Sequence, residues 1–70
     1  MWIRNQDKKK LINANEVWAE NGYIYASTTS TTIGWSGVFM GKYETDRAIE
    51  ILDAIQSQIF LQVIYQMPEE

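Results

Sequence analysis

The sequence predicts an α+β fold: an antiparallel sheet of about four strands, followed by one amphipathic helix and a short C-terminal strand. Apolar and polar residues alternate over much of residues 2–42, Asn21-Gly22 is a strong turn signal, and apolar residues recur at helical spacing between residues 48 and 59. Because 70 residues suffice for one small core, residues 1–70 are expected to form a single domain.

The first expected strand covers residues 2–6, where side chains alternate between two faces. One face carries an indole, a guanidinium and an amide, which belong to Trp2, Arg4 and Gln6. Residues 7–10 form a polar turn, and a second strand is expected from about Leu11 to Glu20. Apolar residues change faces within this second strand, so we expect a β-bulge near residues 13–16.

The Asn21-Gly22 pair predicts a hairpin with a type I′ turn, because both residues tolerate a positive φ. This turn sets three cross-strand pairs: Glu20–Tyr23, Trp18–Tyr25 and Val17–Ala26. The aliphatic face, which is expected to meet the helix, consists of Val17, Ala19, Ile24 and Ala26. The opposite face is aromatic and polar and consists of Glu16, Trp18, Glu20, Tyr23, Tyr25 and Ser27.

The last strand of the sheet is expected over Gly34 to Met40, after the β-branched stretch STTSTT at residues 27–32. A helix then begins with Thr45 as its N-cap and ends near residues 57–60. Its core stripe consists of Ala48, Ile51, Leu52, Ile55 and Ile59, widened by Ile49 and Phe60. A short strand is expected from Val63 to Gln66 and ends before Pro68.

Composition narrows the function classes. The chain has no cysteine and no histidine, so common nucleophile and base pairs are absent and neither a metal nor another cofactor is expected. Residues 1–42 hold five basic and three acidic side chains, whereas residues 43–70 hold one and six. This distribution argues against binding to duplex DNA. The start of the chain resembles neither a signal peptide nor a membrane anchor, so a cytoplasmic protein is expected.

The candidate binding residues are Trp2, Arg4, Gln6, Trp18, Tyr25 and Arg47. An indole stacks on a base, a guanidinium pairs with a phosphate, and an amide recognises a base edge, so together they suit a nucleotide-like ligand. The alternative is that the tryptophans are core or interface residues and that Arg4 lies over them. For Arg47, the alternative is a salt bridge to Glu50 or Glu44.

Two further features leave other functions open. Asp46, Glu50 and Asp53 share one face of the helix, where they could hold Mg²⁺ in a small hydrolase or belong to a solvated surface. The nine aromatic side chains exceed what one sheet face and one helix can cover. A homodimer or a higher oligomer is therefore expected.

Four segments carry a resemblance to known proteins: MWIRNQDKKKLIN, GKYET, RAIEILDAIQ and YQMP. Together they resemble a family of small phage and prophage proteins from Gram-positive bacteria. This group is similar to the phage Thoeris anti-defence sponges, which form homo-oligomers and sequester cyclic nucleotide immune signals such as cyclic ADP-ribose isomers. Some of these sponges also take cyclic oligonucleotides.

The resemblance implies a phage-encoded sponge that acts in the cytoplasm of the infected bacterium and binds its cyclic nucleotide at subunit junctions without turnover. Members of the family often have more residues between the helix and the YQMP segment, whereas residues 58–63 make this connection directly here. A pocket formed by that connection is therefore in doubt. The alternative function is a protein-binding inhibitor of a host defence or nucleic-acid enzyme, which would use the aromatic hairpin face and the acidic helix.

Overall fold

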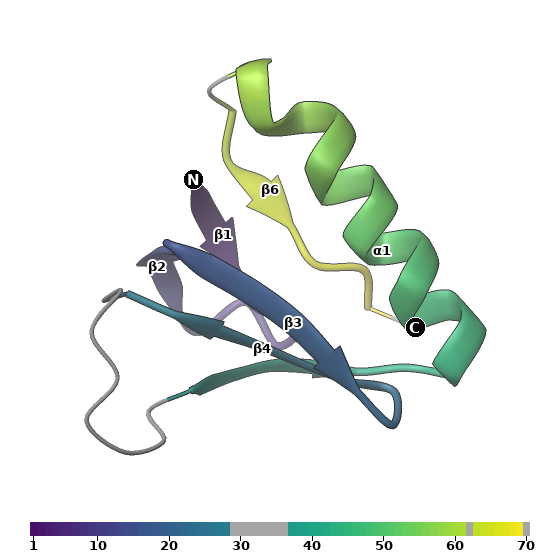
Figure 1. Cartoon of the computed structure of the whole chain (residues 1–70). Coiled ribbons are helices and arrows are strands. Elements are labelled where there is room, and N and C mark those ends of the chain that lie inside the picture. Colours follow the sequence, from purple (N-terminus) through teal and green to yellow (C-terminus); the bar gives the residue numbers. More distant parts are fainter. Residues whose placement is uncertain (29–36, 62, 70) are drawn as a thin grey trace.

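The computed structural model describes residues 1–28, 37–61 and 63–69, and its described part confirms the α+β class. The strands are β1 (Trp2–Arg4), β2 (Leu11–Asn13), β3 (Glu16–Glu20), β4 (Tyr23–Ser27), β5 (Val38–Lys42) and β6 (Tyr65–Gln66). The helix α1 spans Thr45–Gln58 and continues into a short 3₁₀ helix, η1 (Ile59–Leu61). Figure 1 shows α1 lying along one side of the strands.

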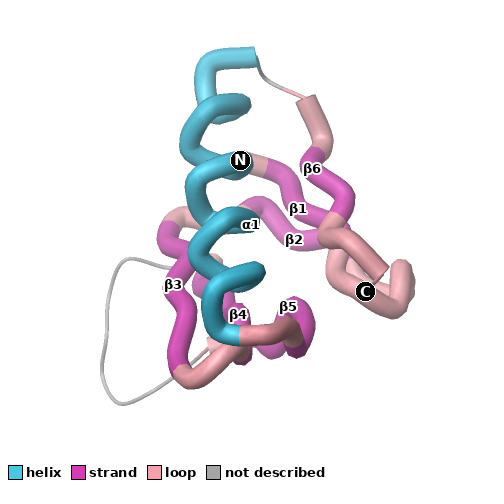
Figure 2. Tube along the Cα trace, turned by 90° about the vertical axis from the view of Figure 1, so that its right-hand side faces the viewer, coloured by secondary structure: helices cyan, strands magenta, loops and turns pink. Residues whose placement is uncertain are grey.

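The described strands form two three-stranded sheets rather than one. The first has the order β2-β1-β6, with β2 antiparallel and β6 parallel to β1. The second has the order β3-β4-β5 and is antiparallel throughout. Figures 1 and 2 show α1 beside both sheets. The two sheets and the helix enclose one hydrophobic core.

The predicted continuous strand over residues 11–20, with its bulge, is wrong. The chain leaves the first sheet at Ala14, whose N–H donates to the carbonyl of Met1 at 2.8 Å. It joins the second sheet at Asn15, whose N–H donates to the carbonyl of Ser27 at 2.8 Å. The change of faces in the sequence therefore marks a crossing between two sheets, because each half of the segment turns its apolar residues toward the same core.

The hairpin is confirmed, including its register. Asn21 and Gly22 have φ values of 51° and 86°, and the three predicted cross-strand pairs all form. A Cβ on Gly22 would collide with the backbone carbonyl of Tyr43, so glycine is required there for both its conformation and its size. Ile24 and Ala26 are fully buried beneath α1, as the aliphatic face of the hairpin predicts.

Strand β5 begins later than expected, at Val38, and residues 34–36 of the predicted strand lie outside the described residues. Its pairing with β4 shifts register between Ile24 and Tyr25, so that Met40 has no partner in β4. Met40 turns into the core instead, and its carbonyl accepts a hydrogen bond of 2.8 Å from the N–H of Gln6. The bulge thus connects the second sheet to the segment that follows β1.

The helix buries a narrower stripe than expected. Ala48, Ile51 and Ile55 are buried, whereas Ile59 and Ile49 are 52% and 51% exposed. Thr45 is not the N-cap: Glu44 occupies that position in an extended conformation, without a hydrogen bond from its side chain. The predicted helix end near residues 57–60 is confirmed, since α1 gives way to η1 after Gln58.

The C-terminal segment closes the core. Strand β6 covers only Tyr65 and Gln66 of the predicted residues 63–66, and Tyr65 and Met67 are both buried. The N–H of Met67 donates to the carbonyl of Arg4 at 3.0 Å, and the hydroxyl of Tyr43 donates to the carbonyl of Pro68 at 2.6 Å. The segment is therefore part of the fold rather than a loose tail.

Candidate functional site

The outer face of β3-β4-β5 carries a row of aromatic side chains that point away from α1. We call it the aromatic row, and it consists of Trp18, Tyr23, Tyr25 and Phe39. Cross-strand pairing brings Trp18 beside Tyr25 and Tyr25 beside Phe39. The local cause is the alternation of strand residues: while Ile24 and Ala26 enter the core, their neighbours must face outward.

The rings of the row contact one another. The centroids of Trp18 and Tyr25 are 5.9 Å apart with the rings 26° from parallel, and Tyr23 and Tyr25 stack at 6.4 Å. Phe39 lies 6.1 Å from Tyr23 and 6.2 Å from Tyr25 in tilted and edge-on arrangements. Because the rings already touch, a planar ligand would lie across the row rather than between two of its members.

The row is accessible from solvent. Phe39 is 48% exposed and Tyr23 36%, while Trp18 and Tyr25 are half-buried. A single exposed aromatic residue is ordinary on a protein surface, but four adjacent ones form an apolar surface that favours binding. The contacts between the rings also limit their rotation, so less side-chain entropy is lost when a ligand stacks on them.

Charged groups lie at one end of the row. The ammonium of Lys42 is 5.5 Å from the ring centroid of Tyr23, which is a cation–π distance. The indole Nε1 of Trp18 donates to the carboxylate of Glu20 at 3.1 Å. Lys42 therefore supplies a positive charge beside the rings, and Glu20 sets the orientation of the indole.

A hollow of about 450 Å³ lies next to Lys42, at the Tyr23 end of the row. It is lined by Asn21, Lys42, Tyr43, Glu44 and Thr45. Its amide, ammonium and hydroxyl groups can donate hydrogen bonds to an anionic oxygen, whereas the carboxylate of Glu44 opposes an anion. The row and the hollow together could bind a molecule with a planar ring and a nearby anionic group.

The structure brings only two of the predicted binding residues together, Trp18 and Tyr25. Trp2 and Arg4 lie on the outer face of the other sheet, on either side of buried Ile3. Arg4 donates from Nε to the carbonyl of Lys8 at 3.0 Å and so supports the turn after β1. The six predicted residues therefore do not form one site.

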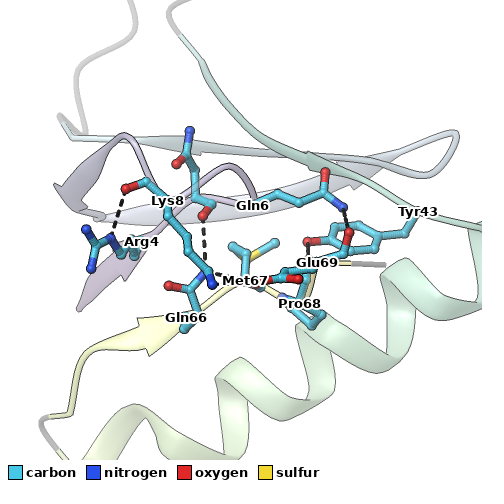
Figure 3. A network of polar contacts seen from close by, with 9 residues as sticks. Arg4, Gln6, Lys8, Tyr43, Gln66, Met67, Pro68 and Glu69 are labelled. Carbon is cyan, nitrogen blue, oxygen red and sulfur yellow. Dashed lines mark hydrogen bonds and ion pairs between the residues drawn. The ribbon is translucent and has the colours of Figure 1, made fainter.

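Gln6 has a structural role. Its amide oxygen accepts from the N–H of Lys42 at 3.0 Å, and its amide nitrogen donates to the carbonyl of Glu69 at 3.1 Å. Figure 3 shows the Gln6 side chain extended toward the C-terminal segment, where Tyr43 also contacts Pro68. Because this amide already forms hydrogen bonds with backbone groups of two segments, it is poorly placed to recognise a ligand.

Arg47 lies on the opposite side of β3-β4-β5 from the aromatic row, because α1 covers the inner face of that sheet. Its Nη1 is 3.3 Å from a carboxylate oxygen of Glu50, which is the salt bridge that the sequence offered as the alternative. Burial raises the pKa of Tyr65 above its usual value, and the positive charge of nearby Arg47 partly offsets this rise. Arg47 thus acts within the fold and is distant from the row.

Three residues at the aromatic row were not among the predicted binding residues: Tyr23, Phe39 and Lys42. Tyr23 is two residues before Tyr25 in β4, and alternate residues of a strand face the same side, so the hairpin register already placed Tyr23 on this face. Phe39 and Lys42 require the register of β5, which depends on the bulge at Met40. Gly41, which follows Met40, is a local signal of that bulge, because a glycine within a strand often marks one, but it does not give the register.

The carboxylates of Asp46, Glu50 and Asp53 do not form a metal site. Among the residues that the structure describes, no group of three or more histidine, cysteine, aspartate or glutamate side chains could hold a metal ion. In the same described ranges, no helix has the length and apolar character that crossing a bilayer requires. The aromatic row therefore remains the strongest candidate for a functional surface.

No protein-family model matches the chain, and neither a curated protein nor a solved structure matches it. The resemblance to phage sponges therefore stays a prediction.

Proposed function

We propose that the protein is a non-catalytic binding protein that sequesters a cyclic nucleotide immune signal on the aromatic row. The ligand is a cyclic ADP-ribose isomer or a cyclic oligonucleotide, and binding takes place in the cytoplasm of a phage-infected bacterium. The observation that carries this proposal is the row of four contacting aromatic rings with Lys42 at its end. The resemblance to the sponge family supplies the ligand class and the phage setting.

The chemistry of the row suits the base of such a ligand. Stacking a base on an aromatic side chain is worth about 1–3 kcal/mol and tolerates any base, because every base has a π-face. Tyr23 and Phe39 present the most exposed surface of the row. Because their rings are tilted by 55°, a flat base stacks on one of them, and we place it on Tyr23, the ring beside Lys42. The ligand then needs an attachment for its phosphates.

Lys42 and the adjoining hollow provide that attachment. With the base over Tyr23, a phosphate one sugar away lies toward the ammonium, within reach of the amide of Asn21. Glu44 in the same hollow weakens this binding by repulsion. Sequestration requires affinity but no general base, which agrees with a chain that has neither histidine nor cysteine.

Native mass spectrometry with a panel of cyclic ADP-ribose isomers, cyclic dinucleotides and cyclic trinucleotides tests the proposal. We expect one class of ligand to be retained with its mass unchanged. Lys42→Met, which keeps the aliphatic stem, should weaken binding by about tenfold, whereas Lys9→Met in the turn after β1 should leave it unchanged. Glu44→Gln should strengthen binding severalfold because it removes the repulsion.

Two results would contradict the proposal. If no member of the panel is retained, the row is not a cyclic nucleotide site, and a protein-binding inhibitor becomes the better explanation. If a ligand is consumed rather than held, the protein is an enzyme. In that case Glu50→Gln, which alters the acidic face of α1, would show whether that face takes part.

A further inference from the structure

A second apolar surface lies where α1 ends, on the first sheet's side of the molecule. We call it the apolar patch, and it consists of Trp2, Ile59, Phe60, Leu61, Val63 and Ile64. All six side chains are exposed, and Phe60 is 92% exposed. The sequence has no charged residue between Asp53 and Glu69, so this stretch of the patch carries no charge.

The patch contains a projecting side chain and part of the lining of a hollow. Phe60 projects from η1, and its neighbour Ile59 lines a hollow of about 370 Å³. The other residues around this hollow are Met1, Trp2, Asn13, Val63 and Ile64. Since an apolar cavity of roughly 150 Å³ is enough to bind benzene, the hollow has room for a phenyl ring.

We propose that the apolar patch is the interface of a two-fold symmetric homodimer, in which Phe60 of each copy inserts into the hollow of the other. A surface that carries a projection next to a matching hollow can pair with itself through a two-fold rotation. Each copy then makes the same contact twice, and both contacts lie within one continuous interface.

The size of the patch agrees with a stable dimer. Its six side chains expose on the order of 700 Å², close to the ~800 Å² that each partner buries in a standard complex. Patches on monomers usually measure only a few hundred Å². A central aromatic side chain that enters a pocket is also the arrangement typical of a binding hot spot.

The charge pattern favours a second copy over other partners. The chain has a net charge of −3, so two copies would repel each other if their acidic surfaces met. A patch without acidic side chains avoids this repulsion. A lipid surface is a weaker match, because membrane-binding surfaces carry several lysines or arginines around their apolar residues. Residues 54–68 contain none, and Arg4 shares the outer face of β1 with Trp2.

This inference goes beyond the proposed ligand and does not depend on it, because the aromatic row and the apolar patch belong to different sheets. The test therefore uses the protein without any nucleotide. Native mass spectrometry and analytical ultracentrifugation at low micromolar concentration should show a dimer for the wild type.

The first variant is Phe60→Asp, which places a charge on the projection without disturbing the core, since Phe60 is almost fully exposed. It should weaken dimerisation by about a hundredfold, as expected for a hot-spot residue. The matched control is Ile49→Asp, which introduces the same charge at an exposed isoleucine of α1 outside the patch. The control should remain dimeric, and circular dichroism should show that both variants are folded.

A second variant tests whether Phe60 enters this particular hollow. Ile64→Lys places a positive charge on the wall of the hollow and should also give a monomer. When Phe60→Asp and Ile64→Lys are mixed, one Asp meets one Lys and the other contact is wild type. An isotope label on one variant should therefore reveal a heterodimer although each variant alone is monomeric.

Three results would overturn the inference. A monomeric wild type would do so, and co-sedimentation of that monomer with phosphatidylcholine vesicles would assign the patch to a lipid surface. A Phe60→Asp variant as dimeric as the Ile49→Asp control would place the interface elsewhere. A mixture that stays monomeric would exclude reciprocal insertion. If Ile64→Lys does not fold, the comparison of Phe60→Asp with Ile49→Asp still shows whether the patch is the interface.

Discussion

At the scale of single residues, the polar side chains near β1 form contacts that stabilise the fold, and they are not available to bind a ligand. Gln6 links the N–H of Lys42 to the carbonyl of Glu69, which lie 36 and 63 residues further along the chain. Lys8 forms a salt bridge of 2.6 Å with Glu69, which lowers the pKa of that carboxyl. These contacts connect the first turn, β5 and the C-terminal segment.

The role of Gln6 leads to a stability prediction. Gln6→Ala should lower the free energy of unfolding by about 1 kcal/mol, because the N–H of Lys42 loses its amide partner. Ligand binding by the folded variant should be unchanged. Urea denaturation measures the loss, with Gln56→Ala on the exposed side of α1 as the control. A variant with wild-type stability but no ligand binding would instead make Gln6 a ligand contact.

Tyr65 leads to a prediction about pH. Burial raises the pKa of Tyr65 above its ordinary value of about 10, so the folded protein holds the phenolic proton more tightly than the unfolded chain. The resulting stability is complete below the unfolded pKa and is lost as the pH rises through the folded pKa. The free energy of unfolding should therefore fall more steeply above pH ~10 in the wild type than in Tyr65→Phe.

Urea denaturation between neutral and alkaline pH checks this dependence. Tyr23→Phe on the exposed aromatic row removes the same hydroxyl group outside the core and is the matched control. Identical slopes for Tyr65→Phe and the wild type would show that the buried phenol does not contribute.

At the scale of elements, the hairpin of β3 and β4 organises the site. Its turn fixes the register that stacks Trp18 on Tyr25, and the carbonyl of Gly22 accepts from the N–H of Tyr43 at 2.8 Å. The turn therefore also positions the chain between β5 and α1, where Lys42 and the hollow lie. One local motif thus supports both halves of the proposed ligand site.

Gly22→Ala should destabilise the protein by about 1–3 kcal/mol, because alanine is strained at a positive φ. The new methyl group would also collide with the carbonyl of Tyr43. Asn21→Gly is the control and should cost little, since glycine adopts the φ of 51° without strain. Thermal unfolding compares the two variants, and equal melting temperatures would contradict this account of the turn.

At the scale of the whole molecule, what could be predicted from the sequence depended on the range of the contacts. The Asn21-Gly22 turn and the position of the helix are determined by neighbouring residues, and both were predicted correctly, although the N-cap is Glu44 and not Thr45. The crossing between sheets at Ala14 and the parallel pairing of β6 with β1 depend on distant segments, and neither was predicted. Alternation alone cannot distinguish one long strand from two short strands that face the same core.

The candidate site shows the same division. Trp18 and Tyr25 could be paired from the turn, but their grouping with Trp2 required knowing how two sheets are arranged. The exposure of Ile59 was also missed, because helical periodicity continues into η1 although the core does not. Sequence patterns therefore identified which face of a hairpin is aromatic, but not which faces lie side by side.

We expect the ligand to bind the aromatic row and not the face that carries Trp2. Two-dimensional NMR of the indole N–H groups during titration with the retained cyclic nucleotide tests this expectation most directly. The Nε1–H signal of Trp18, which is hydrogen-bonded to Glu20, should shift with saturation while that of Trp2 stays in place. A shift of the Trp2 signal with no change at Trp18 would contradict the account and place the ligand on the other sheet.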